Sequence, residues 1–209
     1  MPDAELVAAL RRLVPGGAGI GAADPFGSYP LLPGEDLPGA VPRRLREFAA
    51  GRAAARVALA GIGVTARAIP RGADRAPIWP GEVVGSISHS ATQCLAVAMP
   101  AGLCRGIGLD LEPALPLEPE LWETILRPEE RQGMTGAQAK MIFSAKEAAF
   151  KAQYPVSRAM FGFDAMRIEV NGPRFAAVFT QAVPPFAVGD RISGRIAHAA
   201  GHVVTLAHL

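Results

Sequence analysis

Two short segments of this chain contain the residues whose types and spacing could do chemistry. In the first, residues 106–112 (GIGLDLE), apolar residues alternate with glycine or acid, which predicts a strand with one buried face. Asp110 and Glu112 then project the same way, about 7 Å apart at the backbone. Two like charges this close are unfavourable unless a proton or a cation relieves them, and a hard divalent ion that prefers oxygen ligands would do so. The alternative is that both carboxylates lie at a strand end in water.

The glycines of the same strand favour the metal site. Gly106 and Gly108 leave the face that carries the acids without side chains. A strand that a ligand approaches closely requires such a bare face, so we expect a ligand there.

The second segment, residues 143–151 (FSAKEAAFK), predicts a helix from about 138 to 153 that ends before Pro155. At about 100° per residue, one polar stripe lies directly beside the apolar stripe that contains Phe143 and Phe150. The polar stripe consists of Lys140, Ser144, Glu147 and Lys151. Glu147 is therefore expected at the edge of the buried face, although Glu147 and Lys151 could equally form an ordinary i,i+4 ion pair on the surface.

Arginines crowd one third of the chain and invite an anionic ligand. They are Arg43, Arg44, Arg46, Arg52, Arg56, Arg67, Arg71 and Arg75. The segment from Arg44 to Arg56 is expected to be helical, and guanidinium groups bind phosphate oxygens in a bidentate manner. The alternative interpretation is a solvated, arginine-rich helix.

A hydroxyl and imidazole pair follows a short predicted strand over residues 83–88 (VVGSIS). That strand delivers Ser88 and His89 into a loop, and a second strand over 94–99 leads through a turn back to the Asp110 strand. We therefore expect the loop at one end of the sheet that holds Asp110. No partnered acid stands at a spacing typical of a catalytic triad, so phosphate binding is the better interpretation of Ser88 and His89.

Composition excludes several classes of protein. The chain has 209 residues, half of them hydrophobic, which is enough for one good core or two small ones. No apolar run has the length of a membrane span, and the N-terminus has no basic start followed by an apolar stretch. A net charge of +2 is too small to indicate nucleic-acid binding. Cys94 and Cys104 lack metal-binding neighbours and are expected to be buried. We expect a soluble, cytoplasmic protein with neither membrane nor nucleic acid as a partner.

Several motifs occur in an order that is more specific than any one of them. They are Arg43–Arg56, Trp79-Pro80, residues 85–89 (GSISH), residues 106–112 and residues 143–151. In this order they resemble the 4'-phosphopantetheinyl transferase superfamily, and within it the enterobactin synthetase component D type. The resemblance covers roughly residues 43–155.

The resemblance implies a fold and a division of the chain. The fold is α+β, a pseudodimer of two similar halves, each a small antiparallel sheet packed with a long helix. We place the boundary in the proline-rich segment after the metal strand. Residues 1–113 then hold the coenzyme A-binding arginines, the Ser-His loop and the metal strand, and residues 114–209 hold the Lys-Glu helix and the acceptor side.

The same resemblance assigns the site residues. The magnesium ligands are Asp110, Glu112 and Glu147, and Glu147 also matches the general base, which acts directly or through a metal-bound water. Catalysis is assigned to Glu147, Lys151 and Asp110. The coenzyme A-binding residues are Lys146 and Lys151 near the pyrophosphate, Ser88 and His89 in the phosphate loop, and Arg44, Arg52 and Arg75 around the 3'-phosphate and nucleotide.

The implied activity is the magnesium-dependent transfer of 4'-phosphopantetheine from coenzyme A to a serine of an apo acyl, peptidyl or aryl carrier protein, with release of 3',5'-ADP. Such carriers serve siderophore, nonribosomal peptide and polyketide biosynthesis, and the enzyme is expected to be a monomer. A segment around residues 121–126 is the candidate carrier-binding patch, in which Trp122 is either an anchor or core. Two alternatives stay open: a magnesium-dependent hydrolase of coenzyme A or nucleotides, and a coenzyme A-binding module without catalysis.

Overall fold

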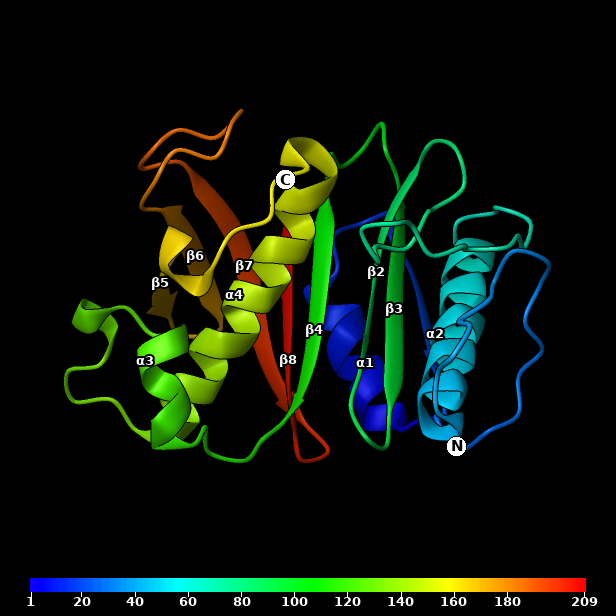
Figure 1. Ribbon diagram of the computed structural model, residues 1–209, viewed down its shortest axis with the longest axis horizontal. Coiled ribbons are helices and arrows are strands. Elements are labelled where there is room, and N and C mark those ends of the chain that lie inside the picture. Colours follow the sequence, from blue (N-terminus) through cyan, green and yellow to red (C-terminus); the bar gives the residue numbers. More distant parts are fainter. The chain divides into compact units, whose positions relative to one another are not determined.

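The protein, described here over residues 1–209 by a computed structural model, folds as two units, Met1–Cys104 and Arg105–Leu209 (Figure 1). We call them the N-terminal unit and the C-terminal unit. Each contains one antiparallel sheet and one long helix, so the predicted α+β class is confirmed. None of the helices is long and apolar enough to cross a membrane. Cys94 and Cys104 are buried free thiols, as expected.

The N-terminal unit has a three-stranded sheet in the order β1-β3-β2. Its elements are α1 (Ala4–Leu13), β1 (Gly19–Ala23), α2 (Pro42–Gly61), β2 (Val83–His89) and β3 (Cys94–Pro100). Asp3 caps α1 by accepting hydrogen bonds from the backbone N–H groups of Glu5 and Leu6. The small residues on one side of α2, such as Ala50, Ala54 and Ala58, let the helix lie close to the sheet.

The C-terminal unit has a five-stranded sheet in the order β4-β8-β7-β6-β5. Its elements are β4 (Ile107–Pro113), α3 (Trp122–Ile125), α4 (Gly136–Ser157), β5 (Met166–Asn171), β6 (Arg174–Phe179), β7 (Arg191–Ala199) and β8 (His202–His208). Helix α4 packs against β4 and β8, and alanines along it meet an apolar core that includes Phe175, Phe179 and Ile192.

Helix α4 is longer than the sequence predicts at both ends. It begins at Gly136 because Thr135 and Gln138 form a reciprocal capping box, and it continues through Pro155 to Ser157. Pro155 lies in the last turn, where its missing N–H removes only one intrahelical hydrogen bond. The helix ends at Arg158, which adopts a left-handed conformation with φ of 57°.

The sequence predicted that β4 lies in one sheet with β2 and β3, and this prediction is wrong. Strand β4 pairs with β8 along its whole length. The expected boundary at residue 113 is therefore wrong, and the division falls between Cys104 and Arg105. The proline-rich segment after β4 is a loop within the C-terminal unit. As a result, Asp110 and Glu112 share one unit with the helix that carries Glu147.

Gly106, directly before β4, and Gly108 within it make room for the helix rather than for a ligand. A Cβ atom added to Gly106 or Gly108 would lie 2.0 or 1.9 Å from the carbonyl oxygen of Ala152 or Ala148 on α4. The N-terminal unit repeats this contact, because Cβ atoms on Gly19 and Gly21 of β1 would lie 2.0 and 1.9 Å from carbonyl oxygens of α2. In each unit a long helix therefore contacts a strand whose Gly-x-Gly sequence has no side chain to keep it away.

This contact predicts that Gly108→Ala destabilises the fold. A methyl group at 1.9 Å from a backbone oxygen forces α4 to move, and overpacking of this kind costs about 1–3 kcal/mol. The free energy of unfolding from urea titration measures the effect. Gly102→Ala is the matched control, because nothing lies within 4 Å of a Cβ atom there. Equal stability of the two variants would contradict the packing argument.

Candidate active site

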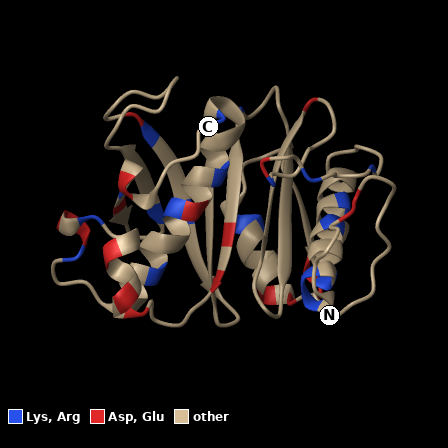
Figure 2. Ribbon diagram, in the orientation of Figure 1, with Lys and Arg blue, Asp and Glu red and all other residues tan.

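The acids of β4 face the polar stripe of α4 inside the C-terminal unit. Figure 2 shows acidic positions along β4 and adjacent basic and acidic positions on α4. Asp110 is only 3% exposed. Its Oδ1 accepts a hydrogen bond from Lys151 Nζ at 2.7 Å, and its Oδ2 accepts one from Ser144 Oγ at 2.9 Å. The predicted strand face and helix stripe therefore do meet.

The two lysines of the stripe make further contacts with β4. Lys140 Nζ donates to Glu112 Oε2 at 3.1 Å. Lys151 forms its ion pair with Asp110, and also donates to the carbonyl oxygen of Leu109 at 3.1 Å. The alternative in which Lys151 serves only as a surface partner of Glu147 is therefore not what the structure contains.

Glu147 lies half-buried on α4 with its charge coupled to this cluster. Burial is the largest cause that raises the pKa of Glu147 above its ordinary value. Lys151 opposes this shift, and the charges of Asp110 and Glu112 add to it. A carboxylate with a raised pKa beside a lysine is typical of a general acid or base.

A pocket of about 200 Å³ lies beside Glu147. Most of its wall is apolar and is formed by Phe150, Met160, Phe161, Gly162, Phe163 and Met166. The apolar wall gives Glu147 a neighbourhood that favours the uncharged carboxyl group, in the same direction as the burial that raises its pKa.

The donor chemistry of the cluster fits a hard divalent cation. No group of three or more His, Cys, Asp or Glu side chains is arranged to hold a metal ion by itself. Mg²⁺, however, is usually held by one or two carboxylates together with substrate phosphates and water rather than by an all-protein cage. Here the ammonium groups of Lys151 and Lys140 lie against the oxygens of Asp110 and Glu112, as cations that offset the two carboxylate charges.

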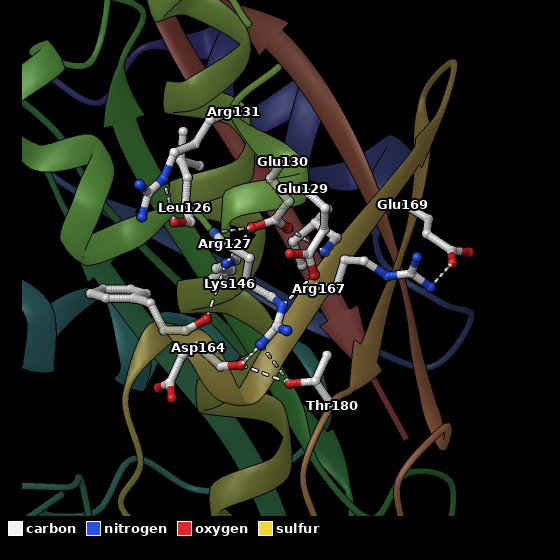
Figure 3. A network of polar contacts seen from close by, with 12 residues as sticks. Leu126, Arg127, Glu129, Glu130, Arg131, Lys146, Asp164, Arg167, Glu169 and Thr180 are labelled. Carbon is white, nitrogen blue, oxygen red and sulfur yellow. Dashed lines mark hydrogen bonds and ion pairs between the residues drawn. The ribbon is translucent and has the colours of Figure 1, made fainter.

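Lys146, which was predicted to lie near the pyrophosphate of coenzyme A, is bound inside the C-terminal unit (Figure 3). The residue is 2% exposed, and its Nζ donates to Glu130 Oε2 at 2.7 Å and to the carbonyl oxygens of Ile125 at 2.8 Å and Phe163 at 3.0 Å. An ammonium group has three protons, and each has a partner here. Burial lowers the pKa of Lys146, an effect that the hydrogen bond and charge of Glu130 oppose. The assignment of Lys146 to coenzyme A binding therefore does not agree with the structure.

Of the predicted phosphate-binding residues, the N-terminal unit brings Arg44 and His89 together. Arg44 Nη1 lies 2.8 Å from His89 Nε2 and 3.2 Å from Glu47 Oε2. Because arginine can only donate, Nε2 of His89 accepts and its proton resides on Nδ1. His89 is the last residue of β2, and Arg44 lies in the first turns of α2 with its side chain 53% exposed.

The three other predicted residues of this unit have different surroundings. Arg52 is 7% exposed, donates from Nε to the carbonyl oxygen of Ile69 at 2.9 Å and lies over the ring of Phe48. Burial lowers the pKa of Arg52 to about 10. Ser88 is buried within β2, and Arg75 is exposed in the loop between α2 and β2.

Two buried glutamates, which the sequence did not single out, organise the loops of the two units in the same manner. Glu35 accepts from the backbone N–H groups of Leu32 and Ile69 and from Arg56 on α2 at 2.6 Å. Glu130 accepts from the N–H groups of Arg127 and Ile168 and from Lys146 on α4. Arg56 is thus held by an internal acid, which removes it from the cations that could bind an anionic ligand.

Trp122 is partly buried and packs as a core residue, one of its two predicted roles. Its ring packs against the apolar core of the C-terminal unit, and its Nε1 donates to the carbonyl oxygen of Leu117 at 3.1 Å. The neighbouring Leu121 is 46% exposed, so the 121–126 segment still presents apolar surface.

Comparison with known proteins agrees with these two units. Residues 33–99 match the 4'-phosphopantetheinyl transferase N-terminal domain, and residues 106–205 match the 4'-phosphopantetheinyl transferase superfamily. The two matches end and begin on either side of the structural division at Cys104. The chain therefore belongs to the 4'-phosphopantetheinyl transferase superfamily, a class of enzymes.

Individual relatives place it more closely. It is 35% identical over 178 residues to 4'-phosphopantetheinyl transferase Svp of Streptomyces mobaraensis, an alignment that covers 79% of this chain and 72% of that protein. It is 34% identical over 151 residues to 4'-phosphopantetheinyl transferase PptT of Mycobacterium tuberculosis, covering 68% of this chain and 66% of that one. Enterobactin synthase component D of Escherichia coli is 40% identical over 119 residues, 53% of this chain and 55% of that protein. The last two alignments span less than two thirds of the relatives' length. The predicted enterobactin synthase component D-like type is confirmed.

The environment of Lys146 generates a prediction. Lys146→Met leaves Glu130 as a buried charge without its counterion, and removing one partner of a buried ion pair costs about 3–5 kcal/mol. Chemical denaturation measures this loss. Arg191→Met, which removes one partner of the exposed pair with Glu169, is the control and should change stability little. A Lys146→Met variant with wild-type stability and no affinity for coenzyme A would instead restore Lys146 to the ligand set.

Proposed function

We propose that this protein transfers 4'-phosphopantetheine from coenzyme A to a serine hydroxyl of an apo carrier protein, releases 3',5'-ADP, and requires Mg²⁺. The observation that carries the proposal is the cluster of Asp110, Glu112 and Glu147 with Lys140 and Lys151 in the C-terminal unit, in a chain of the phosphopantetheinyl transferase superfamily. Opposite charges held close together in a partly buried place suit a reaction in which a pyrophosphate must be positioned and its charge stabilised.

The reaction is an attack of the serine oxygen on the β-phosphorus of coenzyme A. The new bond joins that oxygen to phosphorus, and the bond from phosphorus to the bridging oxygen of the pyrophosphate breaks, so that its electron pair leaves with 3',5'-ADP. Glu147 takes the serine proton, directly or through one water, because its raised pKa brings proton affinity closer to neutral pH. Lys151, which lies against Asp110, offers positive charge to the departing phosphate oxygens.

Asp110, Glu112 and Glu147 are the carboxylates that would supply ligands to Mg²⁺, together with substrate phosphates and water. When bound, the ion supplies positive charge that stabilises the negative charge developing on the pyrophosphate. Lys151 and Lys140, whose present partners are Asp110 and Glu112, would then be available to bind phosphate oxygens.

In the N-terminal unit, Arg44 and His89 are the proposed phosphate ligands, with Ser88, Arg52 and Arg75 as further candidates. The exposed guanidinium of Arg44 presents several N–H donors beyond the one directed at His89. The imidazole of His89 is a second hydrogen-bonding group beside that guanidinium. Charge-assisted hydrogen bonds of this type suit an anionic ligand.

The transfer itself is the first test. Apo carrier protein, coenzyme A and Mg²⁺ should yield a carrier heavier by one phosphopantetheine on serine, with 3',5'-ADP released, as mass spectrometry detects. Glu147→Gln, which keeps the shape of the side chain, should lower kcat by roughly 10²–10⁴-fold, the range for a lost general base. Asp110→Ala should abolish magnesium-dependent transfer. Glu169→Ala, which removes an exposed acid of β5, is the control.

Other outcomes of this experiment select the alternatives. Coenzyme A consumed without a modified serine would favour a hydrolase, and coenzyme A bound but never consumed would favour a binding module. Full transfer in excess chelator would remove magnesium from the mechanism.

Coenzyme A binding is the second test. His89→Ala and Arg44→Ala should each weaken coenzyme A binding by about 1.5–3 kcal/mol, the range for a hydrogen bond to a charged group. Arg46→Ala, an exposed arginine of the same helix, is the control. Calorimetry with coenzyme A and dephospho-coenzyme A separates the phosphates, because a residue that contacts only the 3'-phosphate loses discrimination between the two ligands when it is replaced. Wild-type affinity in both variants would contradict the assignment.

A further inference from the structure

Two buried hydroxyl groups lie behind Asp110, in a position that the proposed mechanism leaves unused. Ser144 on α4 and Thr205 on β8 are both 0% exposed. Ser144 Oγ lies 2.9 Å from Asp110 Oδ2 and 2.9 Å from Thr205 Oγ1. Thr205 Oγ1 also lies 2.8 Å from the backbone carbonyl oxygen of Ser144.

The three contacts have only two hydroxyl protons between them. Ionised Asp110 can only accept, so the proton of Ser144 is directed to Oδ2, where the hydrogen bond to a charged group is the strongest available. The proton of Thr205 is then left for Oγ or for the backbone carbonyl oxygen of Ser144. In the first arrangement Thr205 holds the hydroxyl group of Ser144, and in the second it holds Ser144 through its backbone. In both, the hydroxyl group of Ser144 holds Asp110.

The backbone supports the same chain of contacts. Asp110 and Thr205 are directly paired across β4 and β8, and the register of these strands runs without interruption from Ile107 opposite His208 to Pro113 opposite His202. Helix α4 is held against both strands, and the carbonyl contact of Thr205 ties β8 to the helix at Ser144. The two hydroxyls therefore connect the three elements that meet at Asp110.

Asp110 is consequently held from two sides that differ in kind. Lys151 binds Oδ1 from the half-buried edge of the cluster, with its side chain 28% exposed, and can exchange Asp110 for another anion. Ser144 binds Oδ2 from the fully buried side and has no access to solvent. When Lys151 leaves Oδ1, the hydrogen bond from Ser144 still holds Oδ2 of the carboxylate.

We infer that Ser144 and Thr205 are positioning residues that orient Asp110 for magnesium. The inference rests on the proposed role of Asp110 as a magnesium ligand. Hydrogen bonds from outer residues fix a ligating carboxylate, and their loss typically lowers metal affinity by about 10–100-fold. Because Ser144 and Thr205 act through Asp110, their effect is on the magnesium requirement and not on the proton transfer at Glu147.

Thr205 allows a matched pair of substitutions. Thr205→Val keeps the shape of the side chain and removes the hydroxyl, whereas Thr205→Ser keeps the hydroxyl and removes the methyl group. We expect Thr205→Val to raise the magnesium concentration for half-maximal transfer by about tenfold, with kcat at saturating magnesium close to that of the wild type. Thr205→Ser should stay close to the wild-type requirement. The inference is overturned if Thr205→Ser raises the magnesium requirement, alone or as much as Thr205→Val does. It is also overturned if neither variant raises it.

A second readout does not depend on catalysis. Magnesium chloride is titrated into each protein without coenzyme A, and the rise of the thermal midpoint is measured, because an ion that binds only the folded state stabilises it. The rise should be smaller in Thr205→Val and in Ser144→Ala than in the wild type and Thr205→Ser. The double variant Ser144→Ala/Thr205→Val should lose no more than Ser144→Ala alone, since the two hydroxyls act in series.

The outcomes separate this inference from the proposed function. A wild type that neither needs magnesium nor gains stability from it removes the metal from the mechanism and overturns the inference with it. A wild type that responds to magnesium beside variants that respond equally well overturns the inference alone. Additive losses in the double variant would show independent packing effects, and would also overturn it.

Discussion

The close contact between the long helix α4 and the glycines of the neighbouring strand is the constraint on which the rest of the C-terminal unit depends. Gly106 and Gly108 let the carbonyl groups of α4 come to a distance that no Cβ atom would permit. At this distance the polar stripe of α4 reaches the acids of β4 directly, so that Ser144 and Lys151 both bind Asp110. A bulkier strand would hold the helix further away and separate these groups. Packing and the proposed site are thus one feature of the structure.

The N-terminal unit has the same helix–strand packing but no acidic residues at the contact. Its Gly19 and Gly21 contact α2 as Gly106 and Gly108 contact α4, which makes Ala54 and Ala148 equivalent helix positions. Counted from these contacts, Asp110 corresponds to Ala23, Ser144 to Ala50 and Glu147 to Ala53. The buried glutamates Glu35 and Glu130 occur in both units, each with two backbone N–H groups and one cation of the long helix. The repeat therefore preserves what holds a helix to its loops, and only the C-terminal copy has acids where the helix meets the strand.

Two lysines of α4 illustrate how burial decides the role of a charge. Lys146 and Lys151 are both paired with acids at 2.7 Å. The side chain of Lys146 is 2% exposed and its three protons are bound within the unit, so moving it would leave a buried carboxylate without a counterion. The side chain of Lys151 is 28% exposed, and water or a phosphate can replace its partner. A sequence motif that contains both lysines does not distinguish these environments.

The sequence by itself determined the local structure and the family. Alternation predicted β4, a 3.6-residue stripe placed Ser144, Glu147 and Lys151 on one side of a helix, and the order of the motifs predicted the phosphopantetheinyl transferase superfamily and its α+β fold. Only the tertiary structure decided that β4 pairs with β8 rather than with the β2–β3 hairpin, and that helix α4 packs on its glycines. It also decided that Lys146 is buried in an ion pair and that Thr205 contacts the serine that binds Asp110. The physical reason is that an alternating strand has the same pattern whichever partner it binds. The partner of β4 lies almost a hundred residues further along the chain, at His202–His208, and local patterns carry no information about contacts at that separation.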